Sequence, residues 1–501
     1  MGSLYISVLA ILAWLILCVF MWRLHRAKQQ ITITKDTSTL IVYASQTGNA
    51  LTIANRCAQA LQLSEMSDVL PLNSLTFEHL SQMEKVLFVV STYGDGKAPD
   101  DGNLFNQRLE QALKDEITLK QVNYSVIALG DSSYPDFCAF GHQVNNGLKA
   151  LKAQPLSELI TLDNYDEETT VFSDIVPPWL DINNTEIDKT QSSSSYSWQL
   201  VEREILNPNC GDELLVKISL KCLGATPIWQ AGDLIDIQPR NSVEIVENWL
   251  LKHVFDGSLW LTHQGHQQPL AAWLFERELP EKCHIPVSDL LEHLPYLAKR
   301  SYSIASITEN KQLELIIRLL KKDDKSFGLA SSFLSHHSKV GDLIEGKIRS
   351  VKANHIINNT QPIILIGSGS GLAGLKAQIA SRTYAQQTLN EKIGAMWLIY
   401  GERRNDPQLP INQHLFTLKD TQLDKLSCTY SQGNNYPKYV QDILVSDQYI
   451  IKKWLDEGAI IYVCGCLSGM GESVHQTLID TLGQSTLDAL QQEQRYIRDV
   501  Y

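Results

Sequence analysis

A heptapeptide near the middle of the chain, residues 300–306, reads Arg-Ser-Tyr-Ser-Ile-Ala-Ser. In an extended strand alternate side chains share a face, so Arg300 and Tyr302 face one way and the serines beside them the other. An arginine fork can hold a pyrophosphate through two bonds, a tyrosine face can lie against a flat ring, and a serine hydroxyl can reach a ring nitrogen. These groups suit a flavin dinucleotide. The alternative is an ordinary edge strand with exposed hydroxyls, since short motifs recur by chance.

Length and composition limit the possible functions. A chain of 501 residues predicts about three domains. The formal net charge of -13 argues against nucleic acid as a partner, because phosphate binding needs a basic surface, and it is compatible with docking a basic protein. Nine cysteines without a Cys-x-x-Cys pair fit neither a disulfide framework nor a zinc site, so we expect no metal. Reduced core cysteines indicate a cytosol-like compartment.

The N-terminal segment predicts a transmembrane anchor over residues 1–26. Leu4 to Trp22 is apolar except for one serine, which is about one bilayer span, and basic residues follow at once. The positive-inside rule then places the rest of the chain in the cytoplasm, as a single-pass membrane protein. The alternatives are a secretory signal peptide, which lacks its cleavage site here, and a buried core helix.

Three segments in the first third of the chain repeat one pattern: a buried strand, a loop rich in hydroxyls and glycine, and a helix. Their strands are Leu40–Ala44, Val86–Val90 and Tyr124–Ala128, and Leu159–Leu162 is a fourth strand candidate. Loop N–H groups at a helix N-terminus form an anion cradle, and without a P-loop lysine a monophosphate ester suits it better than a triphosphate. Parallel strands with such loops predict an open doubly wound α/β sheet with a ligand at its switch point.

The three loops resemble the FMN loops of the flavodoxin-like domain in diflavin reductases. The resemblance implies that the first loop holds the FMN phosphate, that Tyr93 and Tyr134 flank the ring, and that Asp163 is an acidic residue near the flavin. The alternative for the tyrosines is that they only fill turns. The FMN-binding residues implied in this way are Ser45, Gln46, Thr47, Gly48, Asn49, Thr92, Tyr93, Gly94, Gly130, Tyr134 and Asp163.

The pattern changes after a polar segment, residues 183–195, that reads as a flexible linker. Strands broken by Asn, Gly and Pro turns follow and suit an antiparallel barrel, which residues 241–297 interrupt with helical patches at 243–254 and 270–278. The predicted domains are the flavodoxin-like FMN domain at 38–182, the barrel at 196–355 and a C-terminal domain at 356–501.

Residues 300–306 resemble the FAD signature of the ferredoxin-NADP reductase superfamily. The stretch from Gly328 resembles the family's Gly-x-x-Ser-x-x-Leu, where a helix N-terminus completes the pyrophosphate site. The chain also ends like the sulfite reductase flavoproteins, in which the terminal aromatic covers the FAD ring. The FAD-binding residues implied in this way are Arg300, Tyr302, Ser303, Ser306, Gly328, Ala330, Ser331 and Tyr501.

A glycine-rich loop at 367–374 follows a buried strand and lets backbone approach a pyrophosphate, and two arginines after the next strand suit a 2′-phosphate. Together with the resemblance to the family's 2′-phosphate positions, this pattern implies the following NADP-binding residues: Gly367, Gly369, Gly371, Arg403, Arg404, Ser431, Lys438, Tyr439 and Gln441. The chain departs from the family at Gln432, where an Arg is usual, and at Pro437, where a Lys is usual. NADPH is therefore favoured, with weaker selection against NADH than the family norm.

Tyr462-Val463-Cys464-Gly465 resembles the family's Tyr-Val-Cys-Gly, whose Cys lies beside the nicotinamide. The resemblance implies that Ser303, Cys464 and Asp499 line the contact between nicotinamide and flavin as catalytic residues. Asp499 would offset the positive charge that grows on the ring as hydride leaves. The rival interpretation is a Cys-x-Cys metal site that includes Cys466.

The whole pattern resembles a membrane-anchored diflavin reductase of the sulfite reductase flavoprotein / NADPH–haemoprotein reductase family. Its fold would join a transmembrane helix, a flavodoxin-like domain, a ferredoxin-NADP-reductase-like barrel with a short helical insert, and a Rossmann-like NADP domain. Electrons would pass from NADPH to FAD, to FMN and then to a haemoprotein or the haem subunit of a sulfite reductase. The alternatives are a ferric-chelate or quinone reductase and a redox scaffold with impaired coenzyme use.

Overall fold

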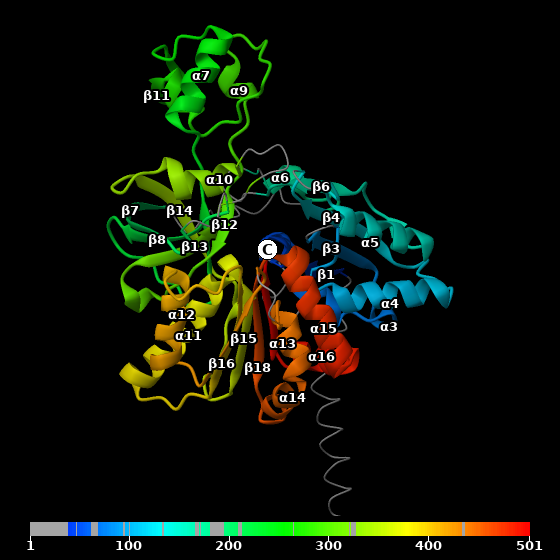
Figure 1. Ribbon diagram of the computed structural model, residues 1–501. Coiled ribbons are helices and arrows are strands. Elements are labelled where there is room, and N and C mark those ends of the chain that lie inside the picture. The colour runs from blue at the N-terminus through cyan, green and yellow to red at the C-terminus, as the bar shows by residue number, and fades with distance from the viewer. Residues whose placement is uncertain are drawn as a thin grey trace, which may run out of the picture. The chain divides into compact units, whose positions relative to one another are not determined.

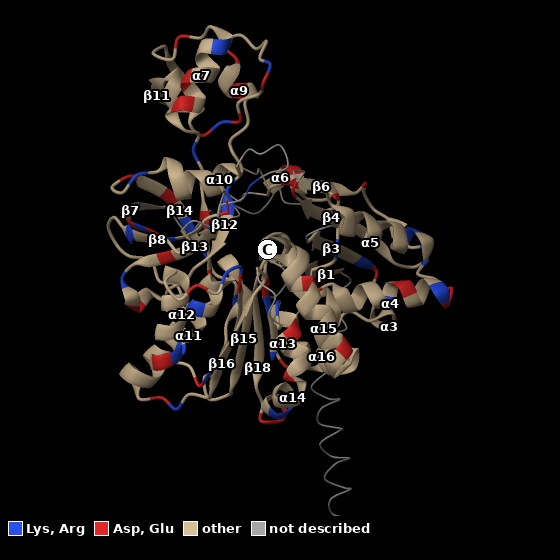
Figure 2. Cartoon of the chain, in the orientation of Figure 1, with Lys and Arg blue, Asp and Glu red and all other residues tan. Residues whose placement is uncertain are grey.

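The computed structural model describes residues 39–46, 48–61, 69–93, 96–99, 101–132, 135–165, 170, 172–180, 195–208, 213–263, 265–319, 321, 327–432 and 436–501. The chain divides into two compact units, Met1–Thr190 and Gln191–Tyr501. Figure 1 shows the helices and strands of each, and acidic and basic residues are interspersed along the elements of both (Figure 2).

The first unit is a parallel sheet with helices on both faces, as the sequence predicts. The strand order is β2-β1-β3-β4-β5, with β6 paired to β4. The central strands are buried along nearly their whole length, because both faces of the sheet are covered. The strands are β1 Thr39–Ala44, β2 Val69–Pro71, β3 Lys85–Ser91, β4 Asn123–Gly130, β5 Gln154–Pro155 and β6 Ile160–Asp163.

The helices of the first unit define two apolar cores, one on each face of the sheet. Phe105 and Phe140 pack with Phe88 on one face. Ile53 and Cys57 pack with Leu87 on the other. The helices are α2 Asn49–Ala60, η1 Leu72–Ser74, α3 Phe77–Leu80, α4 Asn103–Lys114, α5 Ala139–Ala150 and α6 Phe172–Ile175.

The second unit begins with a six-stranded antiparallel sheet of order β12-β9-β14-β7-β8-β13. Its edge strands approach each other through a bridge between Ile304 and Leu315, so the sheet curls toward a barrel. Trp198 is fully buried inside it and donates its ring N–H to the carbonyl of Gly346 at 3.2 Å. The strands are β7 Tyr196–Ile205, β8 Leu215–Cys222, β9 Leu234–Ile237, β12 Arg300–Ser303, β13 Leu313–Arg318 and β14 Leu343–Arg349.

The insert between β9 and β12 forms a small lobe with its own core, on the far side of the barrel from the C-terminal sheet (Figure 1). It contains α7 Val243–His253, a hairpin of β10 Trp260–His263 and β11 His266–Pro269, α8 Leu270–Leu274 and α9 Leu290–His293. The hairpin was not predicted, and the second predicted helix ends at Leu274 rather than at 278. The reason is that Arg277 forms a β-bridge with Tyr296, while its buried guanidinium donates to the carbonyls of Leu291 and Leu294.

The C-terminal part of the second unit is a five-stranded parallel sheet of order β17-β16-β15-β18-β19. The chain moves outward from β15 in one direction and then returns to build the other half, so a switch point lies beside β15. The strands are β15 Ile363–Ser368, β16 Met396–Glu402, β17 Lys425–Tyr430, β18 Ile460–Gly465 and β19 Tyr496–Val500.

The remaining elements of the second unit are helical. The longer helices are α11 Leu372–Leu389, α12 Pro410–Thr421, α13 Val440–Ser446, α14 Gln448–Asp456, α15 Glu472–Leu482 and α16 Gln484–Gln492. The short turns are η2 Thr308–Asn310, α10 Leu329–Ser332, η3 Phe333–His337, η4 Lys352–Asn354, η5 Gly369–Gly371 and η6 Leu467–Gly471.

The predicted single-pass membrane location needs correction. Within the described residues, every helix is too short or too polar to cross a bilayer. The predicted anchor at 1–26, with its span from Leu4 to Trp22, lies outside the described residues. We therefore withdraw the membrane location.

Candidate functional site

Ser303, Cys464 and Asp499 lie together in one buried cluster, although they come from three different strands. Ser303 ends β12 of the barrel, Cys464 lies near the end of β18, and Asp499 lies in β19. The Ser303 hydroxyl donates to Asp499 Oδ1 at 3.3 Å, and the Cys464 thiol donates to Asp499 Oδ2 at 3.3 Å. Tyr462 donates to the same Oδ2 at 3.2 Å. Three donors therefore converge on one carboxylate.

The electrostatics of this cluster follow from its burial. Burial raises the pKa of Asp499 above its ordinary value, because the charged form loses its water, and the three hydrogen bonds only partly oppose this. Burial and the charge of Asp499 raise the pKa of the Cys464 thiol well above its ordinary value. The same two causes raise the pKa of the Tyr462 phenol. Cys464 and Tyr462 therefore stay protonated at neutral pH and act as donors.

The glycine-rich loop packs directly on Cys464. A Cβ at Gly367 would lie 2.4 Å from the Cys464 carbonyl oxygen, and one at Gly371 only 2.0 Å from it. A Cβ at Gly374 would lie 2.6 Å from Asp499 Oδ2. Only glycine fits these positions, so the loop and the carboxylate cluster form one structural feature at the switch point of the C-terminal sheet.

Tyr501, the last residue, lies over the same loop. Its hydroxyl donates to Ser370 Oγ at 2.8 Å, and its backbone N–H donates to the Gly465 carbonyl at 3.0 Å. The residue as a whole is 51% exposed. A terminal residue tied by one side-chain hydrogen bond and partly open to solvent can be displaced by a ligand.

The predicted 2′-phosphate residues gather at the ends of two neighbouring strands. Arg403 and Arg404 follow β16, and Ser431 follows its neighbour β17, donating its N–H to the Glu402 carbonyl at 2.9 Å. The Arg404 guanidinium donates to Gln432 at 3.0 Å. Arg403 forms an ion pair with Glu213, which the sequence analysis did not predict. The structure therefore gives each arginine an internal partner.

The other predicted NADP residues lie at the start of α13. The backbone N–H groups of Lys438 and Tyr439 donate to Asp442 Oδ2, each at 2.9 Å, and Gln441 lies in the first turn. The Tyr439 side chain is exposed. These interactions cap the helix and leave the Tyr439 ring accessible to a ligand.

The predicted FAD residues divide into two sets. Arg300 and Tyr302 lie on β12. Gly328 is the N-cap of α10, and Ser331 in this helix donates to the Gly328 carbonyl at 2.9 Å. Ala330 lies in the same turn. An arginine on the strand and a helix N-terminus are groups that fit a pyrophosphate.

Ser306 belongs to neither FAD set. It is 1% exposed, and its hydroxyl donates to the Gln312 carbonyl and accepts from the Glu314 N–H, both at 3.0 Å. Both of these bonds hold the turn that connects β12 to β13. The flavin contact of Ser306 stays a prediction, and within the described residues its hydroxyl serves this turn.

The predicted FMN phosphate loop has the geometry of an anion cradle. Gly48 has φ +93° and precedes α2, and its N–H donates to Ser45 Oγ at 2.9 Å. The Ala50 N–H points to the same oxygen at 3.3 Å. Gln46 lies within this turn, and Asn49 is the first residue of α2. Converging N–H groups at a helix N-terminus fit a phosphate, while Thr47 lies outside the described residues.

The other two predicted FMN loops lie at the ends of β3 and β4. The Thr92 hydroxyl accepts from the Phe140 N–H at 3.2 Å, and Tyr93 pairs with Lys97 across a tight loop. Asp163 accepts from the Ser132 N–H at 2.8 Å and from its hydroxyl at 2.6 Å, so it holds the third loop in place. A Cβ at Gly130 would lie 2.8 Å from the Cys138 backbone nitrogen. Gly94 and Tyr134 lie outside the described residues.

The chain is similar in sequence to known proteins over most of its length. Residues 41–175 match the family model described as flavodoxin. The sulfite reductase (NADPH) flavoprotein alpha-component of Photobacterium profundum is 25% identical over 92% of this chain and 86% of its own length. That of Bacillus subtilis is 25% identical over 92% and 89%, and NADPH oxidoreductase A of Dictyostelium discoideum is 24% identical over 92% and 88%. This chain belongs to the diflavin reductase family.

Several residues at the site of this diflavin reductase were not predicted from its sequence. Tyr462 could have been found, because it lies two positions before Cys464 on one strand and so shares its face. Glu213 carried no such local signal, since its partner Arg403 lies 190 positions away in the chain. For the rival Cys-x-Cys metal site with Cys466, the described residues bring together no group of three or more potential metal ligands.

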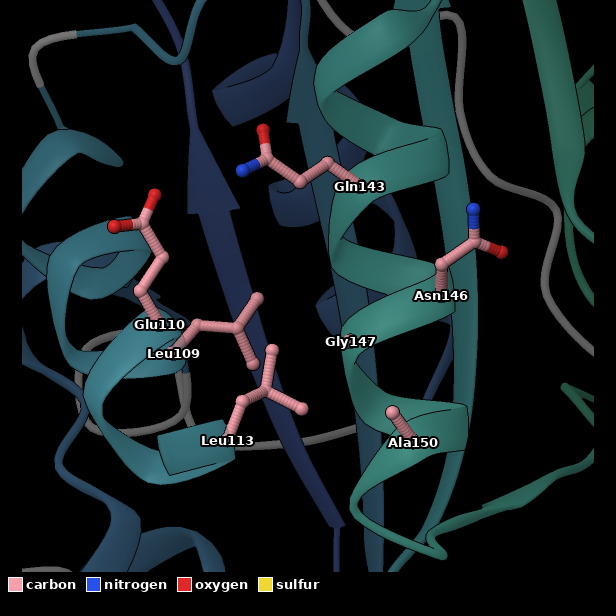
Figure 3. Close-up of a pocket in the computed structure, with 7 residues that line it drawn as sticks. All are labelled: Leu109, Glu110, Leu113, Gln143, Asn146, Gly147 and Ala150. Carbon is pink, nitrogen blue, oxygen red and sulfur yellow. The ribbon is translucent and has the colours of Figure 1, made fainter. Parts of the chain in front are cut away.

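A cavity of about 340 Å³ in the flavodoxin-like unit of this diflavin reductase lies apart from the predicted FMN residues. Figure 3 shows its lining from two helices: Leu109, Glu110 and Leu113 of α4, and Gln143, Asn146, Gly147 and Ala150 of α5. A Cβ at Gly147 would lie 2.7 Å from a methyl of Leu109, so the two helices are in close contact here. We assign no ligand to this cavity.

Proposed function

We propose that this diflavin reductase passes electrons from NADPH through FAD and FMN to a one-electron acceptor protein. Its cofactors are FMN, FAD and NADPH, supported by the flavodoxin match and by the relatives. The relatives' names favour a haemoprotein acceptor, such as the haem subunit of a sulfite reductase.

The observation that carries this proposal is the buried cluster of Ser303, Cys464 and Asp499. The serine comes from the barrel and the other two from the C-terminal sheet. A flavin ring held by the barrel and a nicotinamide held by the sheet would meet at this cluster. Geometry that joins the two parts at one carboxylate suits hydride transfer from one ring to the other.

Each residue of the cluster has a separate role in this proposal. When bound, the flavins supply the redox chemistry, with FAD taking a hydride and FMN delivering single electrons. Asp499 offsets the positive charge that grows on the nicotinamide as hydride leaves. Cys464 keeps its proton and holds the carboxylate from the sheet side, and Ser303 orients it from the barrel side.

The binding roles follow from the groups that fit each cofactor. Arg300, Tyr302 and the α10 N-terminus around Gly328 would hold FAD. The loop at 367–371 and the arginines after β16 would hold NADPH, with Tyr501 above the loop. The Ser45–Asn49 turn and the two loops beside it would hold FMN.

One observation favours a second candidate function, that of a redox scaffold. Arg403, half of the predicted 2′-phosphate fork, already has an internal partner in Glu213. If that pair keeps coenzyme affinity too low for turnover, the chain is a redox scaffold that holds both flavins. A ferric-chelate reductase or a quinone reductase would differ from this proposal only in the final electron acceptor. The transfer from NADPH through FAD and FMN would be the same.

The test uses the full chain purified with its flavins. Released flavins are separated and counted, and NADPH is then added without oxygen while the flavin absorbance is followed. We expect one FMN and one FAD per chain, both reduced by NADPH. A protein that holds both flavins but is not reduced by NADPH is the scaffold. Adding cytochrome c, a ferric siderophore, a quinone or a sulfite reductase haem subunit to the reduced protein then identifies the acceptor class.

A further inference from the structure

Glu213 reaches from the barrel into the C-terminal sheet and contacts two arginines with one carboxylate oxygen. Its Oε2 forms a hydrogen-bonded ion pair with Arg403 Nη2, across 190 positions of the chain. The same Oε2 lies 3.7 Å from Arg318 Nη1. Two guanidinium groups around one carboxylate oxygen form an anion site that is filled from within the protein.

This anion site lies beside the glycine-rich loop. A Cβ at Gly369 would lie 2.3 Å from Arg318 Nη2, so the Arg318 guanidinium rests directly on the loop backbone. Tyr400 holds the same glycine by donating to its carbonyl at 2.8 Å. Arg403 follows the neighbouring strand β16. Glu213 therefore lies at the carboxyl ends of β15 and β16, the edge at which an open parallel sheet binds its ligands.

A second carboxylate, that of Glu402, also lies beside these two arginines, but it differs from Glu213 in its exposure to solvent. Glu402 is 6% exposed, accepts from the Arg403 N–H at 2.8 Å, and lies 4.0 Å from Arg318 Nη2. Glu402 is therefore a buried, fixed residue at the end of β16. The side chain of Glu213 is 38% exposed, so it is the carboxylate that an incoming anion can replace.

We propose that Glu213 is a specificity-determining residue whose carboxylate holds the place of the coenzyme 2′-phosphate at Arg403. This inference rests on the proposed function. NADPH must displace Glu213 before its 2′-phosphate can bind Arg403, whereas NADH leaves the Glu213–Arg403 pair intact. The displacement costs part of the free energy that the phosphate contact provides, so Glu213 narrows the preference for NADPH over NADH.

The experiment compares Glu213→Gln with the wild-type full chain. The amide keeps the size of the side chain and removes the charge. We expect the Kd of adenosine 2′,5′-bisphosphate, measured by calorimetry, to fall about tenfold, the scale of one charge-assisted contact. The KM for NADPH should fall by a similar factor, while the Kd of 5′-AMP and the KM for NADH stay unchanged. Glu213→Asp, which shortens the reach to Arg403, should shift the same constants in the same direction by less.

Two further variants act as controls. Glu276→Gln removes another carboxylate of the same unit that is paired with an arginine, Arg240 at 2.7 Å, and should change none of these constants. In an Arg403→Ala background, Glu213→Gln should no longer tighten the bisphosphate, because the two residues act as one pair.

Three results would overturn the proposal. In the first, Glu213→Gln leaves the bisphosphate Kd unchanged or weakens it. In the second, the variant tightens 5′-AMP equally, so Glu213 does not compete with the 2′-phosphate. In the third, the gain persists without Arg403. Reduction of the wild-type flavins by NADPH separates these results from failure of the proposed function, which would show as no reduction in any variant.

Discussion

Ser303 and Asp499 lie 196 positions apart in the chain, yet the serine hydroxyl donates to the aspartate carboxylate at 3.3 Å inside the protein. This bond joins the barrel to the last strand of the C-terminal sheet. The carboxylate also accepts from Cys464 and Tyr462. Asp499 is therefore one residue at which the two parts of the second unit meet, as the Glu213–Arg403 ion pair is another.

Asp499→Asn should slow reduction of the flavins by NADPH. The amide keeps the shape of the side chain but cannot offset positive charge on the nicotinamide. We expect the rate to fall at least about tenfold, which corresponds to about 1.4 kcal/mol of transition-state stabilisation. Stopped-flow absorbance at saturating NADPH measures it. Glu345→Gln, a carboxylate of the barrel that is bonded to Ser197, is the control. An unchanged rate would leave Asp499 with a structural role alone.

The same substitution should change how stability depends on pH. Burial raises the pKa of Asp499 above its ordinary value of 3.8, so the folded protein binds this proton more tightly than the unfolded chain. In the wild type, the contribution of Asp499 to the free energy of unfolding is therefore fully present below pH 3.8. It is lost as the pH rises through the pKa of the folded state.

We expect Asp499→Asn to escape this loss. Its free energy of unfolding, relative to wild type, should increase from about pH 4 to pH 8, by about 1.4 kcal/mol for each unit of raised pKa. Chemical denaturation at a series of pH values measures this. A difference that is constant with pH would contradict the raised pKa.

Tyr501→Ala should lower the KM for NADH and speed NADH-dependent reduction of ferricyanide. If the terminal ring covers the flavin face that the nicotinamide needs, every coenzyme must displace it, at a cost of roughly 0.5–1.5 kcal/mol for the aromatic contact. NADPH can offset this cost with its phosphate contacts. Release of oxidised coenzyme should also slow, because the ring no longer displaces the nicotinamide.

Tyr501→Phe separates the ring from its hydroxyl, which bonds to Ser370 at 2.8 Å. It keeps the ring and should behave like wild type in coenzyme selectivity. If Tyr501→Ala leaves the ratio of NADPH to NADH activity unchanged in steady-state kinetics, the residue is only a chain end.

Arg403→Ala with Arg404→Ala should raise the KM for NADPH far more than that for NADH. Only NADPH carries the 2′-phosphate, and each lost charge-assisted bond costs about 1.5–3 kcal/mol. The loss of Arg403 also leaves Glu213 without this ion pair, which adds repulsion toward the phosphate. Steady-state kinetics with both coenzymes test this. Equal effects would move the 2′-phosphate site elsewhere, for example to Lys438.

Gly48→Ala should lower the FMN content while FAD stays bound. Gly48 has φ +93° at the start of α2, and its N–H belongs to the proposed phosphate cradle. A Cβ in this left-handed region costs about 1–2 kcal/mol and shifts the donor. Flavin extraction measures both cofactors. The control is Gly224→Ala, which has φ +102° and open space around it in the barrel. Equal loss of FMN from both variants would rule out a specific role for Gly48.

The local elements of the fold could be predicted from the sequence, because hydrophobic periodicity and glycine placement are local properties. The first strand appears where the spacing places it, and so does α7. The hairpin of the insert escaped prediction, since its strands have few apolar residues and their pairing, rather than a buried face, defines them. Ser306 matched a motif, yet its hydroxyl serves a turn.

Tertiary structure alone decided which distant residues share an environment. Motif spacing identifies Cys464, but only the packing of β12 against the C-terminal sheet brings Ser303 to Asp499 and raises the carboxyl pKa through burial. Glu213 had no sequence signal, and its role depends on its contact with Arg403 in the fold. The physical reason is that desolvation and charge pairing act through space, whereas sequence patterns report only the neighbours along the chain.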